Sequence, residues 1–432
     1  MNIKRFGKAG IFLGANIVSA GIPFLLLPFL TKALTPSDYG IVAMFGVMVN
    51  VFGTLTGLSV HGAIGVRYFE LPKNVLARYV GACVGILSIS TIIILGIVAL
   101  FGGWLVGTTS LPYEWLLIAV LVSGMQFVIN IKLTLWRVSG AATRYGIFQV
   151  SQGVVNAGVS LVFIFAFFMA WEGRVLGQVI ATIFFGVLAL LGLFISQELR
   201  CPKAREGHVA DALKFGVPLI PHAIGGLVIV VADRFIIANV LDVQSVGIYT
   251  LALQIGMMIG LITDAFAKVY TPWLYGKLKA NTSSARLEIV GFTYLSWLIF
   301  LFFAFLAAGF CKLFFSAVIG ENFAAAKEIV FWFFLGQTFK GMYLSVSGLF
   351  FFNFRTSSIS WVTFFTGVFS ILMTIAFVNF FGLQGAAIAY VFSEGLLFLL
   401  AWLVSQRICP LPWSEVSGAM RMALERSIWM RS

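Results

Sequence analysis

Residues 79–101 read YVGACVGILSISTIIILGIVALF and contain no charged side chain. A transmembrane helix needs about 20 mostly apolar residues to cross the ~30 Å hydrocarbon core of a bilayer. A strand of a membrane β-barrel would instead alternate apolar and polar residues over about ten positions, and the run from Thr91 to Leu100 does not alternate. Because a helix satisfies its own backbone hydrogen bonds in lipid, the stretch predicts a helix that spans a membrane.

The composition of the whole chain extends this prediction. Of the 432 residues, 60% are hydrophobic and 10% are charged, and the mean hydropathy is +1.02. Soluble domains have roughly 45–50% apolar and about 25% charged residues, so this chain lacks the polar residues that would cover a water-soluble domain. The composition excludes a cytosolic enzyme, a secreted disulfide scaffold and a nucleic-acid-binding protein.

Twelve segments are long and apolar enough to span a bilayer, so we expect an all-α, polytopic membrane protein. With the N-terminus in the cytoplasm, the cytoplasmic segments hold 20 Lys and Arg residues and the opposite side holds four. Cytoplasmic loops are enriched in Lys and Arg, so this excess predicts that both termini are cytoplasmic and accounts for the net charge of +12. The predicted spans are 10–31, 40–62, 79–101, 112–136, 146–170, 175–196, 215–241, 245–272, 289–312, 327–351, 357–380 and 382–405.

The two halves of the chain resemble each other. The pattern Gly-x-x-Ile-Ala-x-x-Phe at 177–184 recurs at 385–392, and Lys132 falls on Lys340 at the same shift. With six spans in each half, we expect two pseudo-symmetric six-helix lobes, related as parallel repeats with a substrate site at their interface. The expected divisions are an N-terminal lobe at 1–197, a cytoplasmic linker at 198–214, a C-terminal lobe at 215–406 and a cytoplasmic tail at 407–432.

Ionisable residues inside the predicted spans are concentrated in the second half. Such a residue near the bilayer centre costs at least about 2.5–3.5 kcal/mol, so it usually faces a wet cavity or a partner. Asp233 is followed by Arg234, and Asp264 is followed one turn later by Lys268; each pair is either a structural ion pair or part of a site. The other candidates in the spans are Lys132, His222, Gln337, Lys340 and Glu394. Lys132 could instead extend its ammonium to the membrane surface, and Glu394 could be a partner of Lys340 or a proton carrier.

The spans of the first half are polar but nearly uncharged. Asn50, Thr54, Gly57 and His61 follow one stripe of the predicted span 40–62. Amide and hydroxyl side chains also line the predicted fourth span. These residues are Ser123, Gln126 and Asn130.

Signatures of catalysis and metal binding are missing from the sequence. It has neither a Gly-rich phosphate loop followed by Lys-Ser/Thr nor the zinc-protease motif His-Glu-x-x-His. Its four cysteines are scattered without metal or redox spacing. We therefore predict a protein that is not an enzyme, with no catalytic residues, no metal site and no cofactor.

Local motifs point to a family. Pro23-Phe-Leu-Leu-Leu-Pro28, Leu34-Thr-Pro-Ser-Asp-Tyr-Gly40 and Gly62 to Arg67 are similar to the first two spans of the polysaccharide-transporter family. Asp233-Arg234 and Val246-Gly247-Ile248-Tyr249 resemble the junction between its seventh and eighth spans. The chain thus resembles the O-antigen, or Wzx-type, flippases of lipid-linked oligosaccharides, within the superfamily that also holds the MATE multidrug exporters.

The resemblance implies a carrier of the bacterial inner membrane that moves undecaprenyl-pyrophosphate-linked O-antigen units to the periplasmic leaflet by alternating access. Implied partners are this lipid-linked substrate, membrane lipids and the polysaccharide polymerase and chain-length proteins, with no nucleic acid. Substrate-binding candidates are Lys340, Arg234, Lys268, Arg67, Lys132, His222, Asn50 and Gln337. Candidates for coupling to H⁺ or Na⁺ are Asp233, Asp264 and Glu394.

Three alternatives remain open from the sequence. A multidrug exporter of the same fold should need an acidic cavity for cationic drugs, whereas the predicted spans, away from their ends, hold four basic and three acidic residues. A lipid II-type flippase would be expected to add two further helices, and the short tail after Cys409 supplies none. A membrane-embedded glycosyltransferase or acyltransferase could be built from the intramembrane carboxylates.

Overall fold

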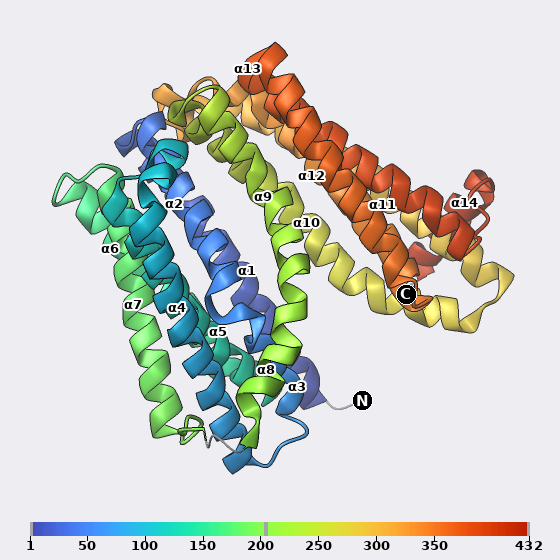
Figure 1. Ribbon diagram of the computed structural model, residues 1–432. Coiled ribbons are helices and arrows are strands. Elements are labelled where there is room, and N and C mark those ends of the chain that lie inside the picture. Colours follow the sequence, from blue (N-terminus) through green and yellow to red (C-terminus); the bar gives the residue numbers. More distant parts are fainter. Residues whose placement is uncertain (1–2, 203–205, 430–432) are drawn as a thin grey trace. The chain divides into compact units, whose positions relative to one another are not determined.

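The computed structural model describes residues 3–202 and 206–429, and it contains helices and no strand within them. The contacts of the chain divide it into two compact units, Met1–Gly247 (unit 1) and Ile248–Ser432 (unit 2). Unit 1 runs from blue to yellow-green in Figure 1 and unit 2 continues to red. Side chains are described except at 3–9, 221–222, 224–226, 228–230, 356, 424 and 426–429.

Within the described residues, unit 1 is built from long helices and four short ones. Its seventh long helix, α9, packs against α2 and α4, and for this reason the contacts include α9 in unit 1. The expected division at 198–214 rests on the internal repeat and stays a prediction. The elements are α1 (Ile3–Ala33), α2 (Pro36–Leu55), η1 (Thr56–Ser59), α3 (His61–Arg67), α4 (Lys73–Thr109), α5 (Tyr113–Val138), α6 (Ala142–Phe165), α7 (Trp171–Ile195), α8 (His208–Gly216), η3 (Val217–Leu219) and α9 (Ile220–Val240).

Unit 2 holds the remaining helices, and α10 begins in the last residues of unit 1. Within unit 2, α12 packs along α13 and the tail helix α14 packs on α11. Gly291 of α11 lets α14 approach closely, because a Cβ there would lie 2.0 Å from the Ala419 carbonyl oxygen. The elements are α10 (Val243–Ala280), α11 (Ser283–Val318), η4 (Glu321–Phe323), α12 (Ala326–Phe352), α13 (Thr356–Ile408) and α14 (Val416–Trp429).

Ten helices within the described residues are long and apolar enough to cross a membrane. One of them, α13, is 53 residues long and has a break at Gly382 (φ 58°), so it contains two of the predicted spans. The predicted span 215–241 corresponds to α9. The prediction of an all-α polytopic membrane protein is confirmed, and the helices accommodate the twelve spans that the sequence predicts.

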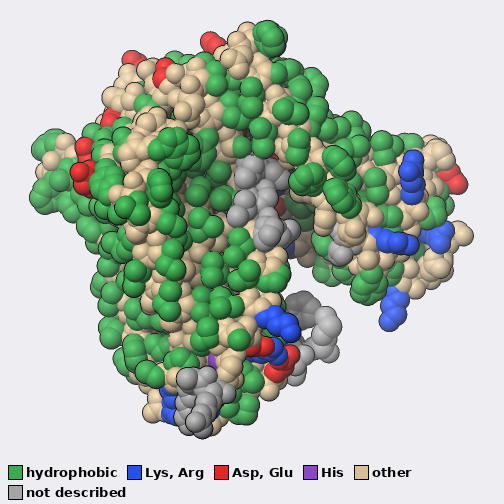
Figure 2. All heavy atoms as spheres, in the orientation of Figure 1, with side chains coloured by type: hydrophobic (Ala, Val, Ile, Leu, Met, Phe, Trp, Pro, Cys, Tyr) green, Lys and Arg blue, Asp and Glu red, His purple; other side chains and the backbone are tan. Residues whose placement is uncertain are grey.

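Apolar side chains cover the outside of these helices. Figure 2 shows them over most of the visible face. Leu25, Ile92 and Leu100 are each more than 60% exposed. Soluble proteins rarely expose large contiguous apolar surfaces, so this surface is the one that contacts lipid.

The predicted span 40–62 is wrong at its C-terminal end. The helix stops at Leu55, turns through η1 and restarts as α3. Gly57, Leu58 and Ser59 all have positive φ, which no α-helix allows. The predicted polar stripe from Asn50 to His61 is therefore interrupted.

Contacts with α4 and α5 stabilise this break. Gly57 has φ 72°, and a Cβ there would lie 2.3 Å from the ring of Phe127. Backbone groups freed inside a membrane must find partners in the protein. The Gly57 N–H donates to Ser90 Oγ at 2.9 Å, and the Thr56 and Ser123 hydroxyls share a hydrogen bond of 3.2 Å.

The family-like motif at 34–40 lies against the start of α10. Thr35 caps α2 by accepting a hydrogen bond from Asp38 N at 3.1 Å, and the Asp38 carboxylate accepts one from Thr35 N at 2.9 Å. Gly40 follows one turn later, where a Cβ would lie 1.9 Å from the carbonyl oxygen of Val243. At Gly247 a Cβ would lie 1.9 Å from the carbonyl oxygen of Pro36, so both glycines are needed for this close approach.

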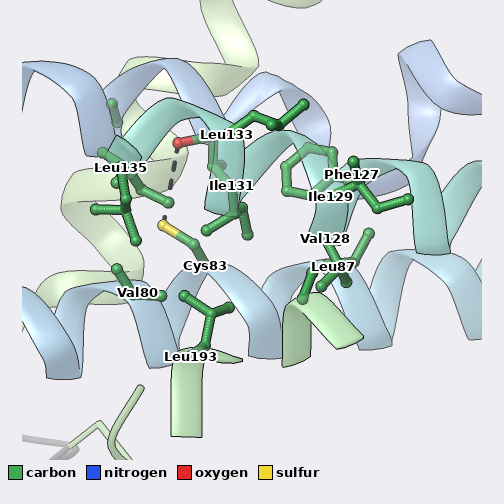
Figure 3. Close-up of a cluster of buried hydrophobic side chains, with 14 of the residues drawn as sticks. Val80, Cys83, Leu87, Phe127, Val128, Ile129, Ile131, Leu133, Leu135 and Leu193 are labelled. Carbon is green, nitrogen blue, oxygen red and sulfur yellow. Dashed lines mark hydrogen bonds between the residues drawn. The ribbon is translucent and has the colours of Figure 1, made fainter. Parts of the chain in front are cut away.

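A cluster of buried apolar side chains holds α4, α5 and α7 together (Figure 3). Cys83 and Leu87 of α4 pack with Ile131 of α5 and Leu193 of α7. The Cys83 thiol is fully buried, and its Sγ lies 4.0 Å from the carbonyl oxygen of Val60, to which it donates a weak hydrogen bond. This core fixes α5 and α7, which carry polar residues of unit 1 that are described below.

Candidate functional site

Three of the predicted site residues come together in unit 2. Lys340 and Gln337 lie one turn apart on α12, and Glu394 lies on the packed helix α13. The charge of Lys340 acts on the Glu394 carboxylate, whose buried Oε2 accepts no hydrogen bond from the described residues. Gln337 is 2% exposed and donates from Nε2 to the Tyr390 hydroxyl at 2.8 Å. A cation, a carboxylate with a free acceptor and an amide thus share one helix contact.

The second predicted pair of unit 2, Asp264 and Lys268, lies on the exposed face of α10. Among the ion pairs of the described residues, none joins these two side chains or includes either of them. The i, i+4 ion pair that their spacing allowed is therefore not formed. Their roles in substrate binding and ion coupling stay predictions.

Asp233 and Arg234 of α9 form an ion pair in unit 1. The Arg234 Nη1 lies 3.1 Å from Asp233 Oδ1, and the side chains are 11% and 15% exposed for Arg234 and Asp233, respectively. The same carboxylate oxygen accepts a hydrogen bond from the Arg234 backbone N–H at 2.8 Å. His222 lies on the same helix, and its side chain is outside the described residues.

Arg67, at the end of α3, is bound to two acids. Its Nε and Nη2 donate to the two carboxylate oxygens of Asp211 on α8 at 3.0 and 2.6 Å, and its Nη1 pairs with Glu70. Tyr79 of α4 also donates to Asp211, at 3.0 Å. Hydrogen bonds from Arg67 lower the pKa of the Asp211 carboxyl, and the two acids raise the pKa of Arg67. Basic and acidic side chains meet in Figure 2 at the end of unit 1 that carries α3 and α8.

Lys132 of α5 is buried in a second polar contact of unit 1. Its ammonium lies 2.5 Å from Glu198 Oε2, and it donates to Ser196 Oγ at 3.0 Å and to the Gly192 carbonyl at 3.1 Å. It also lies 5.1 Å from the centre of the Trp136 ring. Both Lys132 and Arg67 are therefore engaged by acids from the segment that follows α7, and their part in substrate binding stays a prediction.

Asn50 makes a local contact instead. Its Nδ2 donates to the Gly46 carbonyl of its own helix at 2.8 Å, and its side chain is exposed. This bond orients the amide without joining it to another predicted site residue. Its role in substrate binding stays a prediction.

The sequence reasoning missed a polar stripe on α6. Its members recur every three or four residues, which places them on one helix face. A search for amide and hydroxyl groups at this spacing would have found the stripe, whereas a search for ionisable residues passes over it. The stripe consists of Tyr145, Gln149, Gln152, Asn156 and Ser160.

The N-terminal part of this α6 stripe forms hydrogen bonds to α1 and α5. The Tyr145 hydroxyl and the Gln149 Nε2 both donate to Asn16 Oδ1 at 3.2 Å. Gln152 Nε2 donates to Gln126 Oε1 of α5 at 3.2 Å. The buried Oε1 of Gln149 accepts no hydrogen bond from the described residues, so the stripe keeps an open acceptor.

The C-terminal part of the α6 stripe accepts hydrogen bonds from Arg174 of α7. Arg174 Nη1 donates to Asn156 Oδ1 at 2.8 Å and to Ser160 Oγ at 2.9 Å. Gly177 permits this helix contact, because a Cβ there would lie 2.1 Å from Ser160 Oγ. Within the described residues, no cluster of three or more His, Cys, Asp or Glu side chains could hold a metal ion.

Comparison with known proteins adds the family. Residues 7–278 match the model of the family described as "Polysaccharide biosynthesis protein". The chain belongs to this polysaccharide biosynthesis family. The resemblance inferred from the motifs near Pro23 and Asp233 is thereby confirmed. A relative in the curated proteins, Lsg locus protein 1 of Haemophilus influenzae, is 25% identical over 284 residues, which cover 64% of this chain and 67% of the relative.

Solved structures share the fold of this family member. The lipid II flippase MurJ, in an inward closed conformation, matches with a TM-score of 0.69 and 14% identity, over 97% of this chain and 91% of MurJ. An inward-facing multidrug resistance transporter of the MATE family, in the MOP superfamily, matches with a TM-score of 0.66 and 14% identity, over 94% and 96% of the two chains. At this identity the matches show a common fold, and the substrate has to be argued from the site.

Proposed function

We propose that this member of the polysaccharide biosynthesis family is a carrier rather than an enzyme. It would move an oligosaccharide linked to undecaprenyl pyrophosphate, such as an O-antigen unit, from the cytoplasmic to the periplasmic leaflet of a bacterial inner membrane. Both termini would lie in the cytoplasm, and polymerase and chain-length proteins would use the product. The family match and the fold shared with a lipid flippase support this proposal.

The physical problem of this reaction is desolvation. Stripping water from charged phosphates and from sugar hydroxyls costs many kcal/mol unless protein groups replace it. Lys and Arg can replace water around phosphates, and amides can replace it around hydroxyls. The polar groups held in the spans of this chain have the chemistry that such a substrate requires.

Lys340 is the observation that carries the proposal. It lies in an apolar helix, and within the described residues it forms no ion pair closer than 4.0 Å. A cation without a tight counter-ion in a membrane is costly, so it is retained for an anionic ligand or a moving charge. We assign Lys340 to the pyrophosphate and Gln337 to the adjoining sugar.

Glu394 would couple transport to H⁺ or Na⁺. Its Oε2 accepts no hydrogen bond from the described residues and feels the charge of Lys340. When the pyrophosphate takes Lys340, the carboxylate loses its compensating charge and would bind a proton or a sodium ion. Asp233 and Asp264 stay further candidates for this coupling, and Arg234 and Lys268 for the substrate.

The experiment is complementation of a strain that lacks its O-antigen flippase. Lys340→Ala should reduce surface polysaccharide at least tenfold at a normal protein level in the membrane, and Lys340→Arg should restore most of it. Lys327→Ala is the matched control, because Lys327 is an exposed lysine of the same helix. Unchanged polysaccharide in Lys340→Ala, or restored drug resistance in place of polysaccharide, contradicts the proposal.

A further inference from the structure

Arg174 is a cation that no sequence motif singled out, and no carboxylate of the described residues pairs with it in the structure. None of the ion pairs in the described part of the chain includes it. Its hydrogen-bond acceptors, Asn156 and Ser160, are neutral. The titratable group that faces it is the Tyr39 phenol of α2, which carries no charge near pH 7. The charge of this half-buried guanidinium is thus left without a fixed counter-ion.

The hydrogen bonds of Arg174 leave one edge of the guanidinium open. Arg has five N–H donors, and both bonds come from Nη1. Nε and Nη2 make no hydrogen bond to the described residues, and they are not among the buried polar atoms that lack a partner. The three N–H donors on this edge are therefore not completely buried.

Arg67, in the same unit, shows which ligand the Nε/Nη2 edge of a guanidinium binds. There Nε and Nη2 hold the two oxygens of the Asp211 carboxylate at 3.0 and 2.6 Å. Phosphate oxygens fit the same two-pronged donor geometry as carboxylate oxygens. Arg174 presents this edge with no carboxylate in it.

We propose that Arg174 offers the pyrophosphate group a second binding site besides Lys340, on the α6–α7 contact of unit 1. Asn156 and Ser160 hold the guanidinium in place, and Gly177 allows the helices to approach so that they can do so. The site lies in the first turn of α7, where the helix dipole adds positive potential. The choice of pyrophosphate rests on the proposed function, whereas the anion site rests on Arg174 itself.

The α6 stripe continues from this anion site. Gln152 and Gln149 lie on the same face as Asn156, so the stripe from Gln149 to Ser160 covers about 16 Å along the helix. Gln149 Oε1 is a buried acceptor without a partner among the described residues. Sugar hydroxyls next to a phosphate held by Arg174 would meet these amides.

The test measures binding to the purified full-length chain in nanodiscs of a zwitterionic lipid. The probes are farnesyl pyrophosphate, inorganic pyrophosphate and phosphatidylglycerol. Binding of each probe is measured by the change in tryptophan fluorescence. Arg174→Gln should weaken farnesyl pyrophosphate binding at least tenfold. Arg144→Gln, which changes an exposed arginine at the start of α6, should leave it unchanged. Equal losses in both variants, no loss in Arg174→Gln, or equally tight binding of phosphatidylglycerol overturns the proposal.

A second variant covers the case in which Arg174→Gln does not fold. Asn156→Asp places a carboxylate 2.8 Å from the guanidinium and supplies the missing counter-ion. It should raise the melting temperature and lower the affinity for the probe at least tenfold. A raised melting temperature with unchanged affinity means that Arg174 is only structural. A wild-type chain that binds no pyrophosphate probe but still exports polysaccharide refutes this site and leaves the proposed function standing.

Discussion

The ion pair of Lys132 and Glu198 should respond very unequally to removal of either partner. The Lys132 side chain is 4% exposed, whereas Glu198 keeps 36% of its surface in water. Glu198→Gln leaves an ammonium buried with only neutral acceptors. Lys132→Met leaves a carboxylate that water can solvate, and the methionine fills the apolar part of the space. We expect Glu198→Gln to destabilise the protein more.

The magnitude follows from these exposures. Removing one partner of a fully buried ion pair costs about 3–5 kcal/mol, and a solvent-exposed pair contributes at most about 1 kcal/mol. Water partly screens this ion pair on the side of Glu198. In Glu198→Gln the Lys132 ammonium keeps its hydrogen bonds to Ser196 and Gly192. The free energy of unfolding should therefore fall by about 1–3 kcal/mol in Glu198→Gln and by less than about 1 kcal/mol in Lys132→Met.

Thermal unfolding of the purified variants in detergent measures the difference. At roughly 2–4 °C per kcal/mol, Glu198→Gln should lower the melting temperature by about 2–12 °C, and the double variant should recover part of this loss. Equal effects of the two single changes would refute the reasoning from burial. Lost export with an unchanged melting temperature in Lys132→Met would instead support the substrate-binding role that the sequence predicts.

Three further predictions follow from the structure of unit 1. Hydrogen bonds from Arg67 lower the pKa of Asp211, so this contact stabilises the fold above the unfolded-state pKa of about 3.9, and the stabilisation is lost as pH falls through the lower folded-state pKa. The melting temperature of Asp211→Asn should therefore be below that of the wild type at pH 7, and the difference should disappear in acid. A difference that does not depend on pH contradicts this prediction. Gly40→Leu should prevent the approach of Val243, whose carbonyl oxygen lies 1.9 Å from an added Cβ, and should leave little folded protein in size-exclusion chromatography; a normal yield contradicts the close contact. In Gly57→Ala the added Cβ is strained at φ 72° and clashes with the Phe127 ring. This variant should lower the melting temperature more than Gly46→Ala on α2, where no atom lies within 4 Å of an added Cβ. Equal effects of the two substitutions contradict the strained turn.

Hydropathy predicted the helices because the bilayer forces each span to satisfy its own backbone. It could not predict the break at Gly57, where partners from distant residues replace the helical hydrogen bonds. The Ser90 hydroxyl that stabilises this turn is 33 residues away in sequence. Local periodicity continues through such a turn and gives no sign of it.

The candidate site was predictable where one helix carries the chemistry. Gln337 and Lys340 are a turn apart, and the sequence already offered Glu394 as a partner. The Asp211 carboxylate that binds Arg67 is 144 residues away, so only the fold reveals that this arginine is occupied. The role of Arg174 could not be predicted from the sequence, because its hydrogen bond to Asn156 depends on how closely α7 packs on α6.

Leaflet accessibility of the substrate tests the central claim most directly. The full-length chain would be reconstituted in vesicles that hold a lipid-linked oligosaccharide, and a membrane-impermeant glycosidase outside would report the sugars that reach the outer leaflet. We predict that the wild-type chain exposes the inner-leaflet pool within minutes, and that Lys340→Ala leaves it protected while Lys327→Ala does not. Exposure no faster than in protein-free vesicles, with the chain folded and inserted, would contradict the carrier.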